Sequence, residues 1–159
     1  MPRVPNMESF LLSQEPAVRL GAFLAVFGII AAWELAAPRR NLRESKSLRW
    51  THNLALTLLN SVLVRAVLPA AAVGVAAFAA ERGMGLFNLV HVPQSLTILL
   101  SVVALDLVIY LQHLMFHAVP LLWRLHRVHH ADLDFDVTTG TRFHPIEIGL
   151  SMLIRFAVI

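Results

Sequence analysis

The sequence predicts an all-α protein whose helices cross a membrane several times. Of its 159 residues, 57% are hydrophobic and only 14% are charged, whereas charged residues make up about 25% of ordinary soluble domains. Much of the apolar sequence lies in runs of roughly twenty residues, the length that a helix needs to cross the hydrocarbon, and no alternating strand pattern competes with them. We therefore expect a polytopic transmembrane helical bundle at residues 17–159, preceded by a polar leader at residues 1–16.

The first predicted membrane span covers residues 17–37. This run is apolar and ends directly before Pro38, which cannot continue a helix because it lacks a backbone N–H. A cleaved signal peptide is the rival interpretation. It is disfavoured because Trp33 and Glu34 stand where small residues should precede the cleavage site.

A basic loop follows the first span. It carries five cations and a single acid, Glu44; the cations are Arg39, Arg40, Arg43, Lys46 and Arg49. By the positive-inside rule this loop faces the cytoplasm, and the alternative, a solvated linker, also lies outside the bilayer. The sequence pI of about 10.6 would suggest nucleic acid as the partner of a soluble protein. Because these cations lie beside apolar spans, they report topology instead, and we expect no nucleic-acid partner.

Residues 53–80 and 94–119 form the next two predicted spans, and a further span begins at residues 146–159. The segment 53–80 is too long for one upright helix and holds Arg65 and Pro69 near its centre. We favour a single tilted, kinked helix over two half-length helices in a re-entrant hairpin. Arg65 should reach a partner or a polar surface, since a charge at mid-membrane costs about 2.5–3.5 kcal/mol on insertion scales.

Five histidines with helical spacing form the strongest functional signal. They are His113, His117, His126, His129 and His130. The first two are one turn apart, and the last three occupy positions i, i+3 and i+4, so each group shares one face of a helix. A lone histidine is more often a hydrogen-bonded structural group, but two such groups predict metal binding. The chain has no cysteine, so nitrogen and oxygen must hold the metal, and residue types alone allow iron, zinc or copper.

Other polar residues near this segment have less certain roles. Asp106 and Tyr110 share the helix face of His113 and His117, where they would accept the outer N–H of a ligating imidazole. An ion pair between Asp106 and Arg65 or another buried cation is the alternative. We expect the aspartates of segment 132–136 to form a solvated face rather than to bind metal. Span counting places the histidines on the side of the basic loop, the cytoplasmic side.

The histidine segment resembles the fatty acid hydroxylase or sterol desaturase superfamily of integral-membrane di-iron enzymes. The matching features are Asp106, Tyr110, the HxxxH of His113 and His117, the LWRxHxxHH of residues 122–130 and the TTGTRFHPIE of residues 138–147. This resemblance adds His144 as a further metal ligand or supporting residue. It implies two non-haem iron ions, with no catalytic side chain beyond the metal ligands.

The implied reaction is an O2-dependent hydroxylation or desaturation of a fatty acyl or sterol-like lipid. Electrons would come from an external donor such as a cytochrome b5-like protein or a ferredoxin. A zinc-dependent intramembrane hydrolase and a membrane metal-binding or transport protein remain the alternatives. The superfamily carries a further C-terminal HxxHH that this chain does not reach. We therefore expect the chain to be the N-terminal part of a longer protein and to be inactive alone.

Overall fold

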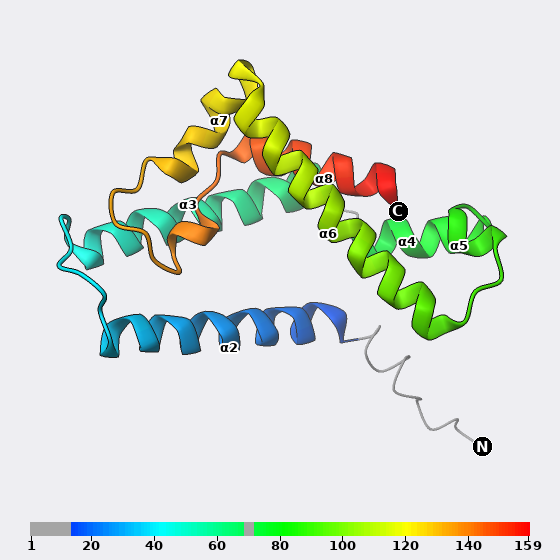
Figure 1. Ribbon diagram of the computed structural model, residues 1–159, viewed down its shortest axis with the longest axis horizontal. Helices are drawn as coiled ribbons and strands as arrows, with labels where there is room; N and C mark the ends of the chain where they lie inside the picture. The colour runs from blue at the N-terminus through cyan, green and yellow to red at the C-terminus, as the bar shows by residue number, and fades with distance from the viewer. Residues whose placement is uncertain (1–13, 69–71) are drawn as a thin grey trace.

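All regular structure in the computed structural model is helical (Figure 1), as the sequence predicts. The model describes residues 14–68 and 72–159, so most of the predicted leader lies outside the described residues. The elements are α2 (Glu15–Ala36), α3 (Lys46–Val67), α4 (Ala72–Glu81), α5 (Leu86–Leu89), α6 (Gln94–Ala118), α7 (Pro120–His130), the 3₁₀ turn η1 (Thr139–Thr141) and α8 (Pro145–Val158).

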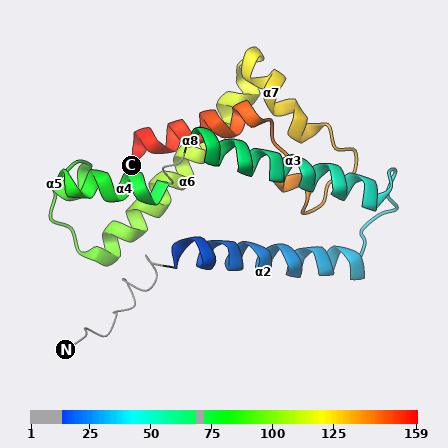
Figure 2. The ribbon, with the colours of Figure 1, turned by 180° about the vertical axis from the view of Figure 1, so that it is seen from behind.

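Three stretches of the described chain are long and apolar enough to cross a membrane, namely Glu15–Ala36, Lys46–Leu89 and Gln94–Ala118. The first and third coincide with the predicted spans 17–37 and 94–119. The middle stretch begins before residue 53 and is divided between α3 and α4, with Pro69 outside the described residues. Figures 1 and 2 show α4 beyond the C-terminal end of α3, not folded back beside it.

Helix α8 lies at the centre of the fold. Helices α2 and α3 run in opposite directions and are joined by the basic loop, while α6 runs obliquely past the C-terminal end of α3 and α7 turns back from its end (Figure 1). The 14-residue α8 contacts α3, α4, α6 and α7. Its first helical residue is Pro145, a position that suits proline because the N–H it lacks would be unpaired there.

The interior of the described part is polar. Only three hydrophobic side chains are buried there, those of Ala31, Ala79 and Phe116. The buried polar or charged residues are Arg49, Asn53, Asn60, His126, Asp132, Asp134, Thr138, Thr139, Glu147 and Ser151. Because lipid tails are apolar, a membrane protein gains little by burying leucines, whereas its polar groups must find partners inside the protein.

A polar stripe on α3 holds the segment that links α7 to α8. The stripe consists of Arg49, Asn53, Thr57 and Asn60, spaced three or four residues apart on one helix face. Each contacts the linking segment; Asn60, for example, donates from Nδ2 to the carbonyl oxygen of Phe143 at 2.8 Å. This stripe therefore fixes the approach to α8.

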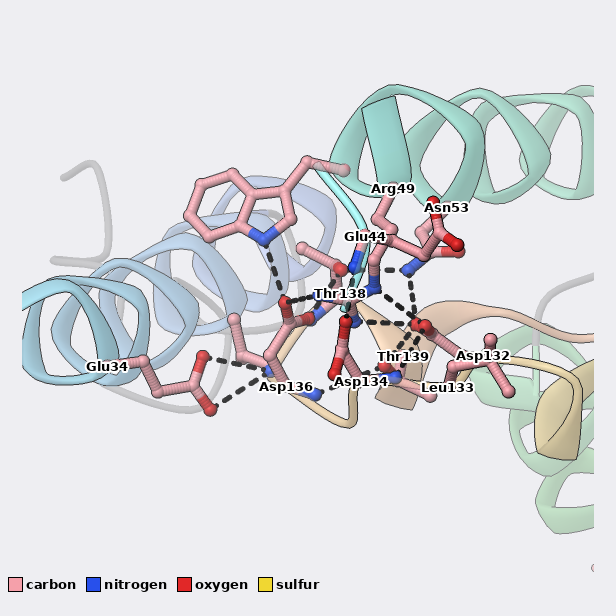
Figure 3. A network of polar contacts seen from close by, with 12 residues as sticks. Glu34, Glu44, Arg49, Asn53, Asp132, Leu133, Asp134, Asp136, Thr138 and Thr139 are labelled. Carbon is pink, nitrogen blue, oxygen red and sulfur yellow. Dashed lines mark hydrogen bonds and ion pairs between the residues drawn. The ribbon is translucent and has the colours of Figure 1, made fainter. Parts of the chain in front are cut away.

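The prediction that segment 132–136 forms a solvated face is wrong. Asp132 and Asp134 are buried, and Asp132 receives a bidentate ion pair from Arg49, with N–O distances of 2.7 and 2.8 Å (Figure 3). Burial alone would raise the pKa of the Asp132 carboxyl, but hydrogen bonds from Arg49, Thr139 and Asn53 lower it to about 2. The carboxylate is thus charged and fully paired.

The other two aspartates tie the same loop to the basic loop. Asp134 Oδ2 accepts the backbone N–H groups of Arg43 and Glu44 at 2.8 and 2.9 Å, and its Oδ1 pairs with Arg40. Asp136 accepts from Arg49 Nη1 at 2.9 Å. We call residues 132–136 with these partners the aspartate clamp. It places the basic loop and the segment after α7 on one face of the protein.

Candidate metal centre

A sharp turn between α6 and α7 brings two histidine pairs together. Pro120 cannot extend α6, and a residue before proline favours extended backbone, as seen for Val119 with φ −94° and ψ 118°. Helix α7 therefore folds back onto the end of α6. Two pairs at i, i+4 spacing then face each other, His113 and His117 on α6 and His126 and His130 on α7.

The Nε2 atoms of these four histidines converge. His117 Nε2 lies 3.2 Å from His113 Nε2 and 3.3 Å from His130 Nε2, which is 3.2 Å from His126 Nε2. All four candidate ligand atoms lie within 4.8 Å of one another. Two nitrogens bound to one ion at about 2.0–2.1 Å with tetrahedral geometry would be about 3.3 Å apart. Three of the six distances match this value, so neighbouring imidazoles in the cluster have the spacing of ligands that share a metal ion.

His126 is the buried member of the cluster. Its side chain is fully enclosed, and its pKa is lowered to about 4 by burial and by the neighbouring His113 and His117. At neutral pH the ring is therefore uncharged, as metal binding requires. Its Nδ1 lies 2.6 Å from Oε1 of the buried Glu147, the first acidic residue of α8. Burial raises the pKa of the Glu147 carboxyl. When this group is ionised it only accepts hydrogen bonds, so Nδ1 then carries the proton and Nε2 presents its lone pair to the cluster.

Two further predicted ligands lie outside the group of four. The ring of His129 stacks on Phe143 at a centroid distance of 4.8 Å and lies 5.5 Å from the ring of His126. Burial lowers the pKa of His129 as well, and its buried Nδ1 has no hydrogen-bond partner in the described part of the chain. His144 caps α8, where its Nδ1 accepts the N–H of Ile146. Their role as metal ligands stays a prediction.

The structure does not bring Asp106 and Tyr110 to the cluster. Both side chains are exposed, Tyr110 to 62%, and within residues 14–68 and 72–159 neither hydrogen-bonds to a histidine. Glu147 instead contacts the outer ring nitrogen, Nδ1, of His126. The sequence did carry a signal for this, since Glu147 is an acid at the start of an otherwise apolar run directly after the histidine segment.

The side of the cluster away from Glu147 is open. His113, His117 and His130 are exposed, and the indole of Trp123 lies beside two of them, with ring centroids 5.3 Å from His117 and 5.4 Å from His130. The cluster therefore has one wall held by buried side chains and one accessible side. Ligands of small size can reach the nitrogen atoms from that side.

Comparison with known proteins identifies this region. Residues 98–159 match the family model described as fatty acid hydroxylase. For this segment, the match supports membership of the fatty acid hydroxylase family. The match confirms the resemblance drawn from the histidine motifs and includes all four clustered histidines and Glu147. No curated protein and no solved structure matches the chain. The fatty acid hydroxylase segment begins within α6, so α2 and α3 precede the matched residues. Helix α3 contacts this segment through Arg49 of the aspartate clamp, and α2 contacts it through Glu34, which accepts the backbone N–H of Val137.

Proposed function

We propose that the protein is a membrane oxidoreductase that uses O2 and two non-haem iron ions to hydroxylate or desaturate a C–H bond of a lipid. The observation that carries this proposal is the convergence of four imidazole Nε2 atoms within the fatty acid hydroxylase segment. An all-nitrogen donor set with an open side suits iron that must leave positions free for O2. When bound, iron supplies the oxidising power for attack on an unactivated C–H bond.

The chain's own residues orient the imidazoles and exclude water from part of the metal site. Helices α6 and α7 hold the imidazoles in pairs, and Glu147 keeps the buried His126 in the tautomer whose Nε2 faces the cluster. Phe116 is almost completely buried beside that ring, 5.9 Å away between centroids. These side chains exclude water from one wall of the site, which strengthens the electrostatic interactions there.

The location supports a lipid substrate. The cluster lies at the C-terminal end of α6, one of the three helices apolar and long enough to cross a membrane, so an acyl or sterol-like chain can approach from the bilayer. Contact with the basic loop through the aspartate clamp, together with the positive-inside rule, favours a cytoplasmic site. A soluble electron donor, either a cytochrome b5-like protein or a ferredoxin, would reach it there.

A zinc-dependent hydrolase is less well supported. Such an enzyme needs a free carboxylate or comparable base beside its metal-bound water. Glu147 is the nearest glutamate in the sequence, but its Oε1 is engaged by His126 Nδ1 on the side of the ring away from the converging Nε2 atoms. The carboxylate is therefore placed to orient a ligand and not to activate water.

Metal analysis joined to a lipid oxidation assay tests the proposal. Because the chain is expected to be inactive alone, the assay uses a protein that also carries the superfamily's C-terminal HxxHH. Purified with iron and supplied with a reductant, this protein should contain iron and consume O2 together with an acyl or sterol substrate. His126→Ala should lose both properties, while His52→Ala, outside the cluster, should retain them. Zinc binding with lipid or peptide hydrolysis but no O2 consumption would overturn the proposal.

A further inference from the structure

The loop of the aspartate clamp presents its side chains in an inverted pattern. Asp132 and Asp134 point inward and are buried, whereas the intervening Leu133 and Phe135 are 56% and 60% exposed. A loop in water would be expected to present its acids to solvent and to cover its apolar side chains. This loop does the reverse, which fits a position at the boundary between head groups and acyl chains.

A hollow of about 550 Å3 lies beside this loop at the end of α2. Its wall combines apolar residues with cations and includes Ala37, Pro38, Leu42 and Phe135. The candidate span Glu15–Ala36 ends within this wall, because Glu34 lines the hollow and Ala37 directly follows the span. The hollow is therefore at the depth where lipid head groups meet the protein.

The cations of the hollow are Arg39, Arg40 and Lys46. Arg40 is paired with Asp134. Arg39 and Lys46 form no ion pair in the described part of the chain, although the ammonium of Lys46 lies 5.6 Å from the ring centroid of Trp50. Two cations thus face the hollow without a carboxylate partner.

The two acids of the hollow are already engaged. Both carboxylate oxygens of Glu34 accept the backbone N–H of Val137 at 3.1 Å (Figure 3). Asp136 accepts from Arg49 and from Trp50 Nε1, each at 2.9 Å. The hollow therefore keeps cationic groups available for an anion while its carboxylates are held by the protein.

We propose that this hollow binds the phosphate of an anionic phospholipid, with Arg39 and Lys46 as the recognising side chains. Basic pockets between transmembrane helices bind phosphate head groups in this way. The exposed Phe135, together with Pro38 and Leu42 of the same wall, would then contact the glycerol and upper acyl region. A soluble phosphate would use the same cations but would leave this apolar rim without a partner. A lipid bound there would seat α2 and the clamp against the membrane.

Lipid retention after extraction from mixed vesicles tests this site. The protein is reconstituted into vesicles of phosphatidylcholine and phosphatidylglycerol, extracted with mild detergent, and analysed by native mass spectrometry for bound lipid. We expect a preference for phosphatidylglycerol that falls about 30-fold in the double variant Arg39→Gln, Lys46→Gln, since each cation near an anionic head group contributes about fivefold. Both side chains lie outside the buried ion pairs, so the variant should fold, which circular dichroism and a monodisperse elution profile verify.

A charge-matched variant separates a site from general surface attraction. Arg124→Gln with Arg127→Gln removes the same charge from α7 and should leave the preference unchanged. Equal losses in the two variants, or no preference in the unaltered protein, would overturn the proposal. Glycerol 3-phosphate and inorganic phosphate form a second arm of the experiment. If these bind with the same dependence on Arg39 and Lys46 while phosphatidylglycerol is not retained, the site serves a soluble anion and the lipid proposal is wrong.

Discussion

The histidine cluster and the aspartate clamp are both groups of titratable side chains, but they differ in how their polar atoms are used. In the clamp, the carboxylate oxygens accept hydrogen bonds from arginine, asparagine, threonine or backbone N–H, and Asp132 and Asp134 are buried. In the cluster, four nitrogens of the same type face one another, and three of the four residues are exposed. In the clamp, hydrogen-bond donors meet carboxylate acceptors, whereas four ring nitrogens of the same type gather in the cluster.

This difference distinguishes a structural group from a metal site. A pair of complementary charges is complete without a ligand, and its removal weakens the fold. Imidazole nitrogens 3.2–3.3 Å apart lack that complementarity and need a shared proton or a cation between them. Mutations in the two regions should therefore affect different measurements.

The largest expected effect is the loss of metal on removing a cluster histidine. Alanine at His113, His117, His126 or His130 should abolish activity and strongly reduce bound metal, because each change removes one of four converging ligands. Membrane insertion and thermal stability should change little for the exposed members. Inductively coupled plasma mass spectrometry measures the metal, and His52→Ala is the matched control. Normal metal content in several of the four variants would show that these histidines are structural.

The clamp should show the opposite behaviour. Asp132→Ala leaves the buried guanidinium of Arg49 without its bidentate partner, and breaking such a pair costs about 3–5 kcal/mol. Denaturant unfolding in detergent should report this loss. The double variant Arg49→Met, Asp132→Leu should recover only part of it. It removes the unpaired guanidinium, but Asp136 loses its ion pair with Arg49 and keeps only the hydrogen bonds from Trp50 and Thr138. If Asp132→Ala unfolds like the unaltered protein but loses metal, the clamp aspartate is a ligand and the contrast between the two regions fails.

The contact between Glu147 and His126 connects buried structure to metal binding. Glu147→Gln keeps the shape of the side chain but weakens its hold on the Nδ1 proton, and loss of such a partner typically lowers metal affinity about 10- to 100-fold. Metal titration against a competing chelator measures the change. Glu147→Asp should restore part of the affinity if orientation of the ring is the cause. If Glu147→Gln and Glu147→Asp both lower the free energy of unfolding but leave metal affinity unchanged, Glu147 serves folding alone.

A structural feature can be predicted from the sequence when the residues that form it are close together along the chain. The apolar lengths of α2 and α6 and the i, i+4 histidine pairs are local patterns, so their positions were predicted within a few residues. The burial of Asp132 depends on Arg49, 83 residues earlier, and the contact of Glu147 with His126 spans 21 residues. The spacing of residues within one helix does not reveal partners that lie so far apart in the sequence. The polar residues of α3 at helical spacing gave a hint, since an apolar helix keeps such a stripe only where it contacts another polar segment.

A smaller effect should appear in acid. Burial alone would raise the pKa of the Asp136 carboxyl, but hydrogen bonds from Thr138 and Trp50 and the charge of Arg49 hold it below 3.8. A lowered pKa in the folded state stabilises the protein above pH 3.8, and this contribution disappears as the pH falls through the lower folded value. Denaturant unfolding of Asp136→Asn should therefore lose stability at neutral pH but show a shallower decline below about pH 4. An unchanged acid profile in this variant would remove Asp136 from the clamp.

The smallest perturbation tests whether the basic loop and the aspartate clamp lie on the same side of the membrane. The chain has no cysteine, so single cysteines report accessibility directly. Ser47 and Leu133 are exposed beside the basic loop and the clamp, and neither side chain pairs with a clamp carboxylate, so Ser47→Cys and Leu133→Cys should leave metal binding unchanged. Contact between the two loops requires both cysteines to react from one side, and the positive-inside rule makes that side the cytoplasm. A membrane-impermeant maleimide should thus label both in inverted vesicles and neither in intact cells, with Met84→Cys, in the turn between α4 and α5, labelled in the opposite pattern. Labelling of Ser47→Cys and Leu133→Cys from opposite sides would contradict the clamp itself, whereas labelling of both from outside would keep the clamp and reverse only the orientation.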